Sequence, residues 1–340
     1  MLALITVGVI LAQAMIVDCG KFNLEVLAKK FTQTNQVNYV SPTFSTVGTN
    51  GYAVIAVVAP PLEASQISDA RFAGQTTYIM QSYINFIEGA GARTVPLVYT
   101  QDLNSELAKL ADLNGVLIPG NSNSNPDYEK FVKAVLDRAK QICDAGKFLP
   151  VLGIAEGLTQ IAQWAANKDA STLLTPITES DSMKSLTFVN SGNTYKMFQG
   201  LGDKALIYQQ SPLTYFDVKR ALLPAKFTSG SNLNTLFRVT STFSANGQQF
   251  VASLEGKSLP FFAVQFNVDR PQYLFTPQST RVDHSYNAIY YNRFFADQFV
   301  NYCRRNKNVY DNAGVELTEN FKKVFTSGKE GLVYTFPQIQ

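Results

Sequence analysis

The segment Gly153-Ile-Ala-Glu-Gly157 constrains the fold of this chain more than any other. The run 148–155 before it has the apolar composition of a buried strand, and 157–166 after it has helical character. A strand, a tight glycine-bracketed turn and a helix form an elbow that presents one strained side chain at the top of an α/β sheet and leaves backbone N–H groups to hold an oxyanion. The side chain presented here is the methyl group of Ala155, which cannot attack a carbonyl.

Strand-like and helix-like segments alternate over the first half of the chain. Apolar runs predict buried strands at 53–59, 94–98 and 115–118. An amphipathic pattern predicts a helix at 127–143. Another helix is expected between the first two strands, with an apolar stripe formed by Ile79, Tyr83, Phe86 and Ile87. The alternation predicts a doubly wound, mostly parallel sheet flanked by helices, with its sites at the carboxyl ends of the strands.

The second half of the chain is richer in strands. The pair Asn246-Gly247 between two strand-like runs predicts a hairpin. A buried strand is expected at 261–266 and a closing helix over 287–305. Because no linker or internal repeat follows residue 50, we predict one α/β domain over 51–340, with strand-rich additions in its second half.

The first 50 residues are predicted to lie outside this domain. Residues 1–14 are apolar, uncharged and end in Ala12-Gln-Ala14, which is typical of a signal peptide and its cleavage site. The run is shorter than a membrane span requires, although an anchor and an N-terminal core strand remain as alternatives. Residues 15–50 are interpreted as an N-terminal extension, which the sequence leaves open as a propeptide, a docking arm or part of the fold. The expected location is the secretory pathway, either extracellular or lysosomal/vacuolar.

Charge and composition restrict the partners of the chain. Hydrophobic residues make up 46% of it and charged residues 16%, which indicates a folded globular protein. The net charge of +3 and the lack of long basic runs argue against nucleic acid as a partner. No membrane span is expected after signal cleavage, and the sequence leaves a homodimer open.

Five segments keep the order and spacing of a known family. They are 78–96, Asn114-Gly-Val-Leu-Ile-Pro-Gly120, Pro150-Val-Leu-Gly153, 254–267 and Asp283-His-Ser-Tyr-Asn-Ala288. Together they resemble gamma-glutamyl hydrolase, a peptidase C26 branch of the class I glutamine amidotransferase-like superfamily. The resemblance spans 52–336 and implies the flavodoxin-like fold of that superfamily. It also implies a cysteine hydrolase (an omega-peptidase) that removes gamma-linked glutamates from folylpolyglutamate.

The same resemblance implies that the catalytic residues of the family are absent. The elbow cysteine of the family falls on Ala155, and the histidine of its Gln-Trp-His-Pro-Glu strand end falls on Asn267. The carboxylate that orients this histidine falls on Asp269, and a further family histidine falls near Asp217. The glycine pair of the oxyanion loop reads Gly120-Asn121. We therefore expect these positions to be catalytically degenerate.

No other residue of the sequence offers a replacement. His284 is the single histidine, which rules out a two-histidine metal site, and a hydrogen-bonded or capping role before a helix is favoured for it. Cys143 and Cys303 lie in predicted helices as small buried residues, and Cys19 lies far from the elbow. Three cysteines allow at most one disulfide, whose pairing stays open. We expect no cofactor and no metal.

A ligand pocket, if it is retained, is expected around Gly120, Asn121, Ala155, Glu156 and Asn267. A Glu156 carboxylate that reached this cleft would oppose the negative charge of an oxyanion. The asparagine-rich segment 121–125 is interpreted as a surface loop before a helix that starts at Pro126-Asp127, rather than as a ligand loop.

Three functional hypotheses follow. The favoured one is a catalytically inactive gamma-glutamyl hydrolase-like pseudoenzyme that acts as a binding or structural protein for an unidentified protein partner. The second is an active gamma-glutamyl hydrolase, which the loss of nucleophile and base at Ala155 and Asn267 disfavours. The third is a non-hydrolysing binder of a gamma-glutamyl or folate ligand.

Overall fold

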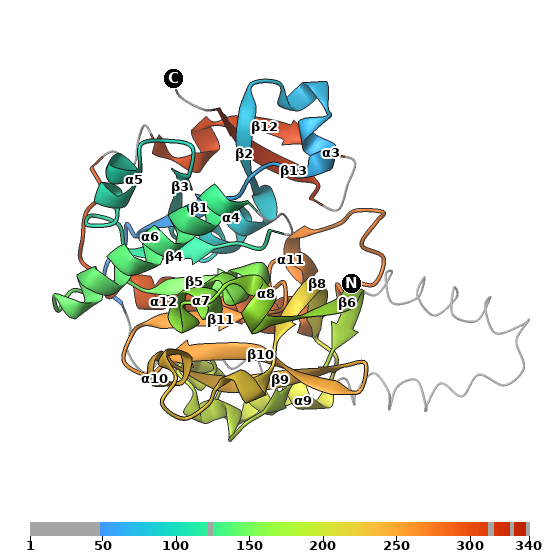
Figure 1. Cartoon of the computed structure of the whole chain (residues 1–340). Coiled ribbons are helices and arrows are strands. Elements are labelled where there is room, and N and C mark those ends of the chain that lie inside the picture. The colour runs from blue at the N-terminus through green and yellow to red at the C-terminus, as the bar shows by residue number, and fades with distance from the viewer. Residues whose placement is uncertain (1–47, 122–124, 312–315, 327–329, 338–340) are drawn as a thin grey trace, which may run out of the picture. The chain divides into compact units, whose positions relative to one another are not determined.

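The computed structural model describes residues 48–121, 125–311, 316–326 and 330–337 (Figure 1). Thr43–Gln340 forms one compact unit. The signal peptide predicted at 1–14 and all but the last three residues of the predicted extension lie outside the described residues.

An eight-stranded sheet forms the centre of this unit (Figure 1). In spatial order its strands are β3 (Arg93–Val98), β1 (Val54–Ala59), β4 (Gly115–Ile118), β5 (Val151–Ile154), β11 (Phe261–Val264), β10 (Gln248–Gly256), β9 (Phe237–Ala245) and β7 (Thr187–Phe188). The strands from β3 to β11 run parallel, and those from β11 to β7 run antiparallel. The α/β fold with a mostly parallel sheet and later antiparallel additions is therefore confirmed.

Helices pack against both faces of the sheet because its strands are apolar on both sides. On one face Ile55 and Val57 of β1 join the core with the helices α4 (Gln81–Glu88) and α12 (Tyr286–Cys303). On the other face Val54, Ala56 and Val58 pack with α6 (Pro126–Asp144) and α7 (Glu156–Ala166). This arrangement confirms the predicted helices over 127–143 and 287–305 to within two residues at each end.

Two smaller sheets flank the central one. The first contains, in spatial order, β12 (Lys322–Phe325), β13 (Leu332–Pro337) and β2 (Gln75–Met80). The second pairs β6 (Leu174–Lys184) with β8 (Thr214–Leu222). The remaining helices are α3 (Ala64–Ile67), η1 (Ala70–Phe72), α5 (Leu103–Lys109), α8 (Ala170–Leu173), η2 (Gly192–Thr194), η3 (Gln199–Leu206), α9 (Ile207–Gln210), η4 (Pro224–Lys226), α10 (Asn232–Leu236), α11 (Arg270–Tyr273) and η5 (Thr318–Asn320).

The helix stripe predicted to include Ile79 is wrong at its start. Ile79 belongs to β2 and pairs with Tyr334 of β13, and the helix begins only at Gln81. The partner strand lies more than 250 residues further along the chain, so nothing in the local pattern reports it. The predicted hairpin is confirmed, because Asn246 and Gly247 form its turn with φ of 49° and 75°.

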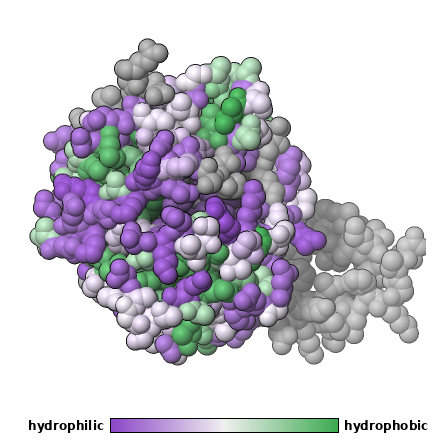
Figure 2. All heavy atoms as spheres, viewed as in Figure 1, coloured by the Kyte–Doolittle hydropathy of each residue, from purple (hydrophilic) through white to green (hydrophobic). Residues whose placement is uncertain are grey.

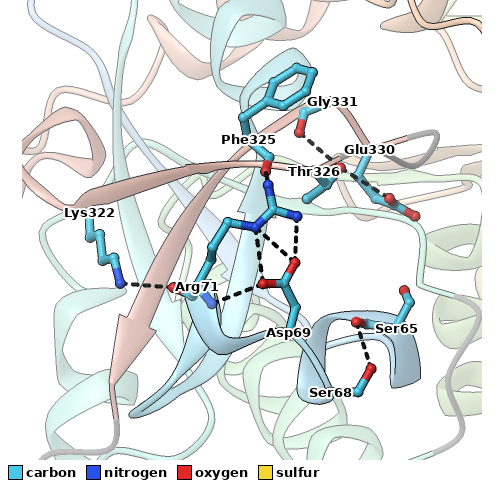
Figure 3. A network of polar contacts seen from close by, with 9 residues as sticks. All are labelled: Ser65, Ser68, Asp69, Arg71, Lys322, Phe325, Thr326, Glu330 and Gly331. Atoms are coloured by element: carbon cyan, nitrogen blue, oxygen red, sulfur yellow. Dashed lines mark hydrogen bonds and ion pairs between the residues drawn. The ribbon is translucent and has the colours of Figure 1, made fainter.

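A polar network fixes the three-stranded sheet to the segment before β2 (Figure 3). The Arg71 guanidinium is hydrogen-bonded to the Asp69 carboxylate and donates to the backbone carbonyl of Phe325 at 2.7 Å. Lys322 returns a hydrogen bond to the Arg71 carbonyl at 2.9 Å. The two arms of this network join segments from opposite ends of the described chain.

The surface in the view of Figure 2 is mostly hydrophilic, with apolar side chains in small scattered groups. Among the described residues, every helix is too short or too polar to cross a membrane.

Candidate functional site

The elbow has the backbone geometry that the sequence predicts. β5 ends at Ile154, α7 begins at Glu156, and Ala155 between them has φ of 54° and ψ of −117°. A non-glycine residue in this region is strained and persists only where its surroundings hold it. The Ala155 N–H donates to the Val264 carbonyl at 2.8 Å, and its carbonyl accepts from the Gln265 side chain at 3.1 Å. Val264 at the end of β11 and Gln265 directly after it therefore hold the strained residue at both its N–H and its carbonyl.

The two glycines of the elbow are needed for close packing. A Cβ on Gly157 would stand 2.1 Å from the carbonyl oxygen of Ile118, at the end of β4. A Cβ on Gly153 would stand 2.7 Å from the Gly157 carbonyl. Hydrogen side chains at both positions let the first turn of α7 lie directly against the ends of β4 and β5.

The loop after β4 lies beside the elbow. A Cβ on Gly120 would stand 2.9 Å from the Ala155 Cβ and 2.8 Å from Glu156 Oε2. The Gly120 N–H donates to the Tyr83 hydroxyl of α4 at 3.2 Å. Asn121 is 7% exposed, so this part of the predicted surface loop is buried. Residues 122–124 lie outside the described residues.

The helix α6 begins at Pro126, as the sequence predicts, and Asn125 precedes it. Its side chain accepts hydrogen bonds from the backbone N–H groups of Asp127 and Tyr128, each at 3.0 Å. It is therefore the N-cap of the helix, with Pro126 in the first turn.

The end of β11 brings Asn267 and Asp269 to the same edge of the sheet. Asn267 is 3% exposed, and its backbone N–H donates to the Tyr215 carbonyl of β8 at 2.8 Å. The Asp269 carboxylate is fully buried and its Oδ2 lies 3.5 Å from Nε of Arg270. Asp269 is therefore a buried carboxylate beside a cation.

Arg270 is the main group that the sequence reasoning missed. Burial is the largest single effect and works against its charge, but the Asp269 carboxylate and the other acidic groups nearby together outweigh it. The pKa of the guanidinium therefore lies above its ordinary value. Asp217 of β8, which is half-buried, acts on Arg270 in the same direction. The guanidinium lies 6.0 Å from the centre of the Tyr83 ring. The only sequence signal was a cation directly after the position that matches a family carboxylate.

The Glu156 carboxyl group of the site has a strongly raised pKa. Its residue is 9% exposed, and burial raises the pKa of its carboxyl group to about 7. A hydrogen bond from its own backbone N–H lowers the pKa, and the negative charge of Asp217 raises it. Because Ala155, Glu156 and Gly120 are in direct contact and Asp217 acts electrostatically on Glu156, the structure brings these predicted site positions together.

His284 lies outside this cluster of contacts. Its Nδ1 donates to the Pro271 carbonyl at 2.8 Å, and its ring stacks on Phe275 with the centroids 4.0 Å apart. The N-cap of α12 is Ser285, so His284 is a hydrogen-bonded residue before the helix and not its cap.

The described cysteines are free thiols in helices. Cys303 is fully buried and Cys143 is half-buried. Burial raises the pKa of both thiols, which disfavours the reactive thiolate. Cys19 lies outside the described residues. Within the described ranges, no three histidine, cysteine or acidic side chains gather in a way that could hold a metal ion.

Two surface grooves lie apart from the elbow residues. One of about 320 Å³ lies between α6 and α7 and includes Lys133 and Trp164. The other, of about 640 Å³, lies beside β2 and includes Tyr99 and Gln75. Neither is lined by Ala155, Glu156 or Asn267.

Fold and site together define an α/β protein of the elbow type, whose site lies at the carboxyl ends of β4, β5 and β11. Residues 53–163 match the profile of the family Peptidase C26. Gamma-glutamyl hydrolase B of Dictyostelium discoideum is 25% identical over 285 residues, which cover 82% of this chain and 80% of that protein. Gamma-glutamyl hydrolase of Rattus norvegicus is 28% identical over 267 residues, 77% of this chain and 82% of that protein. The chain is a distant homologue of the gamma-glutamyl hydrolases.

Among solved structures, a glutamine amidotransferase from Thermotoga maritima aligns with a TM-score of 0.41 at 11% identity. The alignment covers 76% of this chain and 100% of that one.

Proposed function

We propose that this chain is a catalytically inactive gamma-glutamyl hydrolase-like protein that acts as a binding or structural partner in the secretory pathway or outside the cell. The observation that carries the proposal is the residue at the elbow. Ala155 has the strained backbone of a nucleophile position, yet its side chain is a methyl group. The location rests on the apolar residues 1–14 alone.

Isopeptide hydrolysis on such a scaffold requires a thiolate, a base that also protonates the leaving amine, and donors for the oxyanion. Asn267 can form hydrogen bonds, but an amide does not titrate near neutral pH. Loss of members of a cooperating nucleophile and base costs on the order of 10⁴ to 10⁶ in rate. The remaining backbone donors cannot sustain turnover at a useful rate.

The test is mass spectrometry of pteroyl-poly-gamma-glutamate after long incubation with the purified protein. Rat gamma-glutamyl hydrolase serves as the positive control, and the variant Asn267→Ala reports whether any turnover arises at this site. We expect unchanged chains with both forms of the protein. Shortened chains with the parent but not with Asn267→Ala would restore the active-hydrolase hypothesis.

A second candidate function is the binding of a gamma-glutamyl or folate ligand without hydrolysis. One observation favours it: Nδ2 of Asn267 is buried and has no hydrogen-bond acceptor among the described residues. A buried donor of this kind is normally satisfied, and a ligand oxygen or a water can do so. Isothermal titration calorimetry with pteroylpentaglutamate tests this candidate. Saturable heat that is lost in Asn267→Ala supports it, and no heat above dilution rejects it.

A further inference from the structure

The first turn of α7 holds an anion that belongs to the protein itself. The Glu156 carboxylate accepts a hydrogen bond from the Glu156 backbone N–H. Its Oε2 lies 2.8 Å from the point where a Cβ on Gly120 would stand. The N-terminus of this 11-residue helix carries a partial positive charge that attracts anions. The side chain is therefore folded back over its own helix end, against the loop after β4.

This position is the one where an elbow stabilises negative charge. In an elbow, the backbone N–H of the residue after the nucleophile position is a donor to the oxyanion. Here that N–H belongs to Glu156 and is taken by its own carboxylate. The neighbouring N–H of Gly120 is taken by the Tyr83 hydroxyl. Both N–H groups beside Ala155 are thus engaged by side chains of the protein.

We propose that Glu156 closes the anion position at the elbow from within the chain, so that this position accepts another negative charge only when Glu156 is protonated or replaced. The other charge can be a carboxylate of a ligand or a thiolate at position 155. The inference deepens the proposed function, since it adds a second obstacle to hydrolysis that is independent of the missing nucleophile.

The groups that face Glu156 come from four other parts of the fold. They are Tyr83 of α4, Tyr128 of α6, Asp217 and Arg220 of β8, and Glu63 before α3. Asp217 and Glu63 oppose the charge of Glu156, whereas Arg220 favours it. Burial remains the largest effect and raises the pKa of Glu156 to about 7. Near neutral pH the carboxyl group is thus close to an even mixture of its two forms.

A thiolate at position 155 is the probe for the first experiment. The pH titration of thiolate absorbance is recorded for Ala155→Cys and for Ala155→Cys with Glu156→Gln, after subtraction of the parent chain. The matched control is Ala155→Cys with Glu129→Gln, which makes the same change in the first turn of α6. A like charge in contact raises the pKa of a thiol, so we expect Glu156→Gln to lower it by about one pH unit or more. The control should leave it unchanged. Coincident titrations with and without Glu156 would overturn the proposal.

A second measurement titrates Glu156 in the unmodified chain, and the variant Glu156→Gln serves only to assign its resonance. Carbon-13 NMR of labelled glutamate carboxyl groups follows the resonance that is missing from Glu156→Gln. We expect its midpoint near pH 7. A midpoint at the ordinary glutamate value of 4.5 would place the carboxyl group in solvent, away from the elbow, and would also overturn the proposal. Neither readout involves a substrate. Hydrolysis of pteroyl-poly-gamma-glutamate would refute the proposed function and leave both titrations in place.

Discussion

Replacing Glu156 with glutamine is expected to stabilise the protein in alkaline solution and to have little effect in acid. The pKa of this carboxyl group is about 7 in the folded protein, against an ordinary value of 4.5. The folded state therefore holds a proton that the unfolded chain releases between these two values. The stability that comes from this proton is fully present below pH 4.5 and is lost as the pH rises through 7.

The size of the effect follows from the difference between the two pKa values. A gap of about 2.5 pH units between the two pKa values corresponds to a contribution of about 3 kcal/mol to the free energy of unfolding. Most of this, about 2 to 3 kcal/mol, is lost between pH 5 and pH 8 in the parent. Glutamine keeps the shape and the acceptor oxygen of the side chain but carries no charge, so the variant escapes this loss.

Urea unfolding of the parent and of Glu156→Gln at pH 5, 6, 7 and 8 measures the prediction. The difference in unfolding free energy between the two proteins should grow steadily with pH. Glu129→Gln in α6 is the matched control, and its difference from the parent should stay constant over the same range. A constant difference for Glu156→Gln as well would refute the reasoning, because it would mean that burial does not perturb this carboxyl group.

Three further predictions concern the elbow and its neighbours. Gly157→Ala forces a methyl group against a backbone carbonyl and should lower the unfolding free energy by about 3 kcal/mol. The control is Gly51→Ala, whose added methyl group meets open space. Equal urea midpoints for the two variants would contradict the packing argument. Asn125→Ala removes the cap of α6 and should lower stability by about 1 kcal/mol in thermal unfolding followed by circular dichroism; an unchanged transition would show that the cap is dispensable. Ala155→Cys with Asn267→His should release little glutamate from pteroyl-poly-gamma-glutamate, whereas robust release would show that the pocket has stayed competent.

The elements that the sequence predicts well are those whose signals are local. The strand, turn and helix around Ala155 lie within one continuous segment, and glycines mark both sides of the turn. The Asn246-Gly247 hairpin is equally local, because two residues set its turn type. The parallel sheet follows from the alternation of such segments.

What the sequence does not predict depends on distant partners. β2 forms because β13 lies beside it, and without that partner Ile79 fits a helix stripe equally well. Arg270 of α11 and Tyr83 of α4 meet only after these two helices have packed against each other. The hydrogen bond between the backbone N–H and the carboxylate of Glu156 affects the site only because this side chain is buried. A single sequence does not report burial at a polar position.

The clamp on Ala155 also has a consequence for biosynthesis. The strained turn is held by Val264 of β11 and by Gln265 directly after it, and Gln265 stands 110 positions beyond Ala155 in the chain. At about 5 to 20 residues per second, a ribosome needs roughly 5 to 20 seconds to supply them after the turn has been made. During that interval β4, β5 and α7 can form, but the hydrogen bonds that hold the φ of Ala155 are still missing. We therefore expect the turn to be relaxed in the nascent protein and the site to form only late in translation.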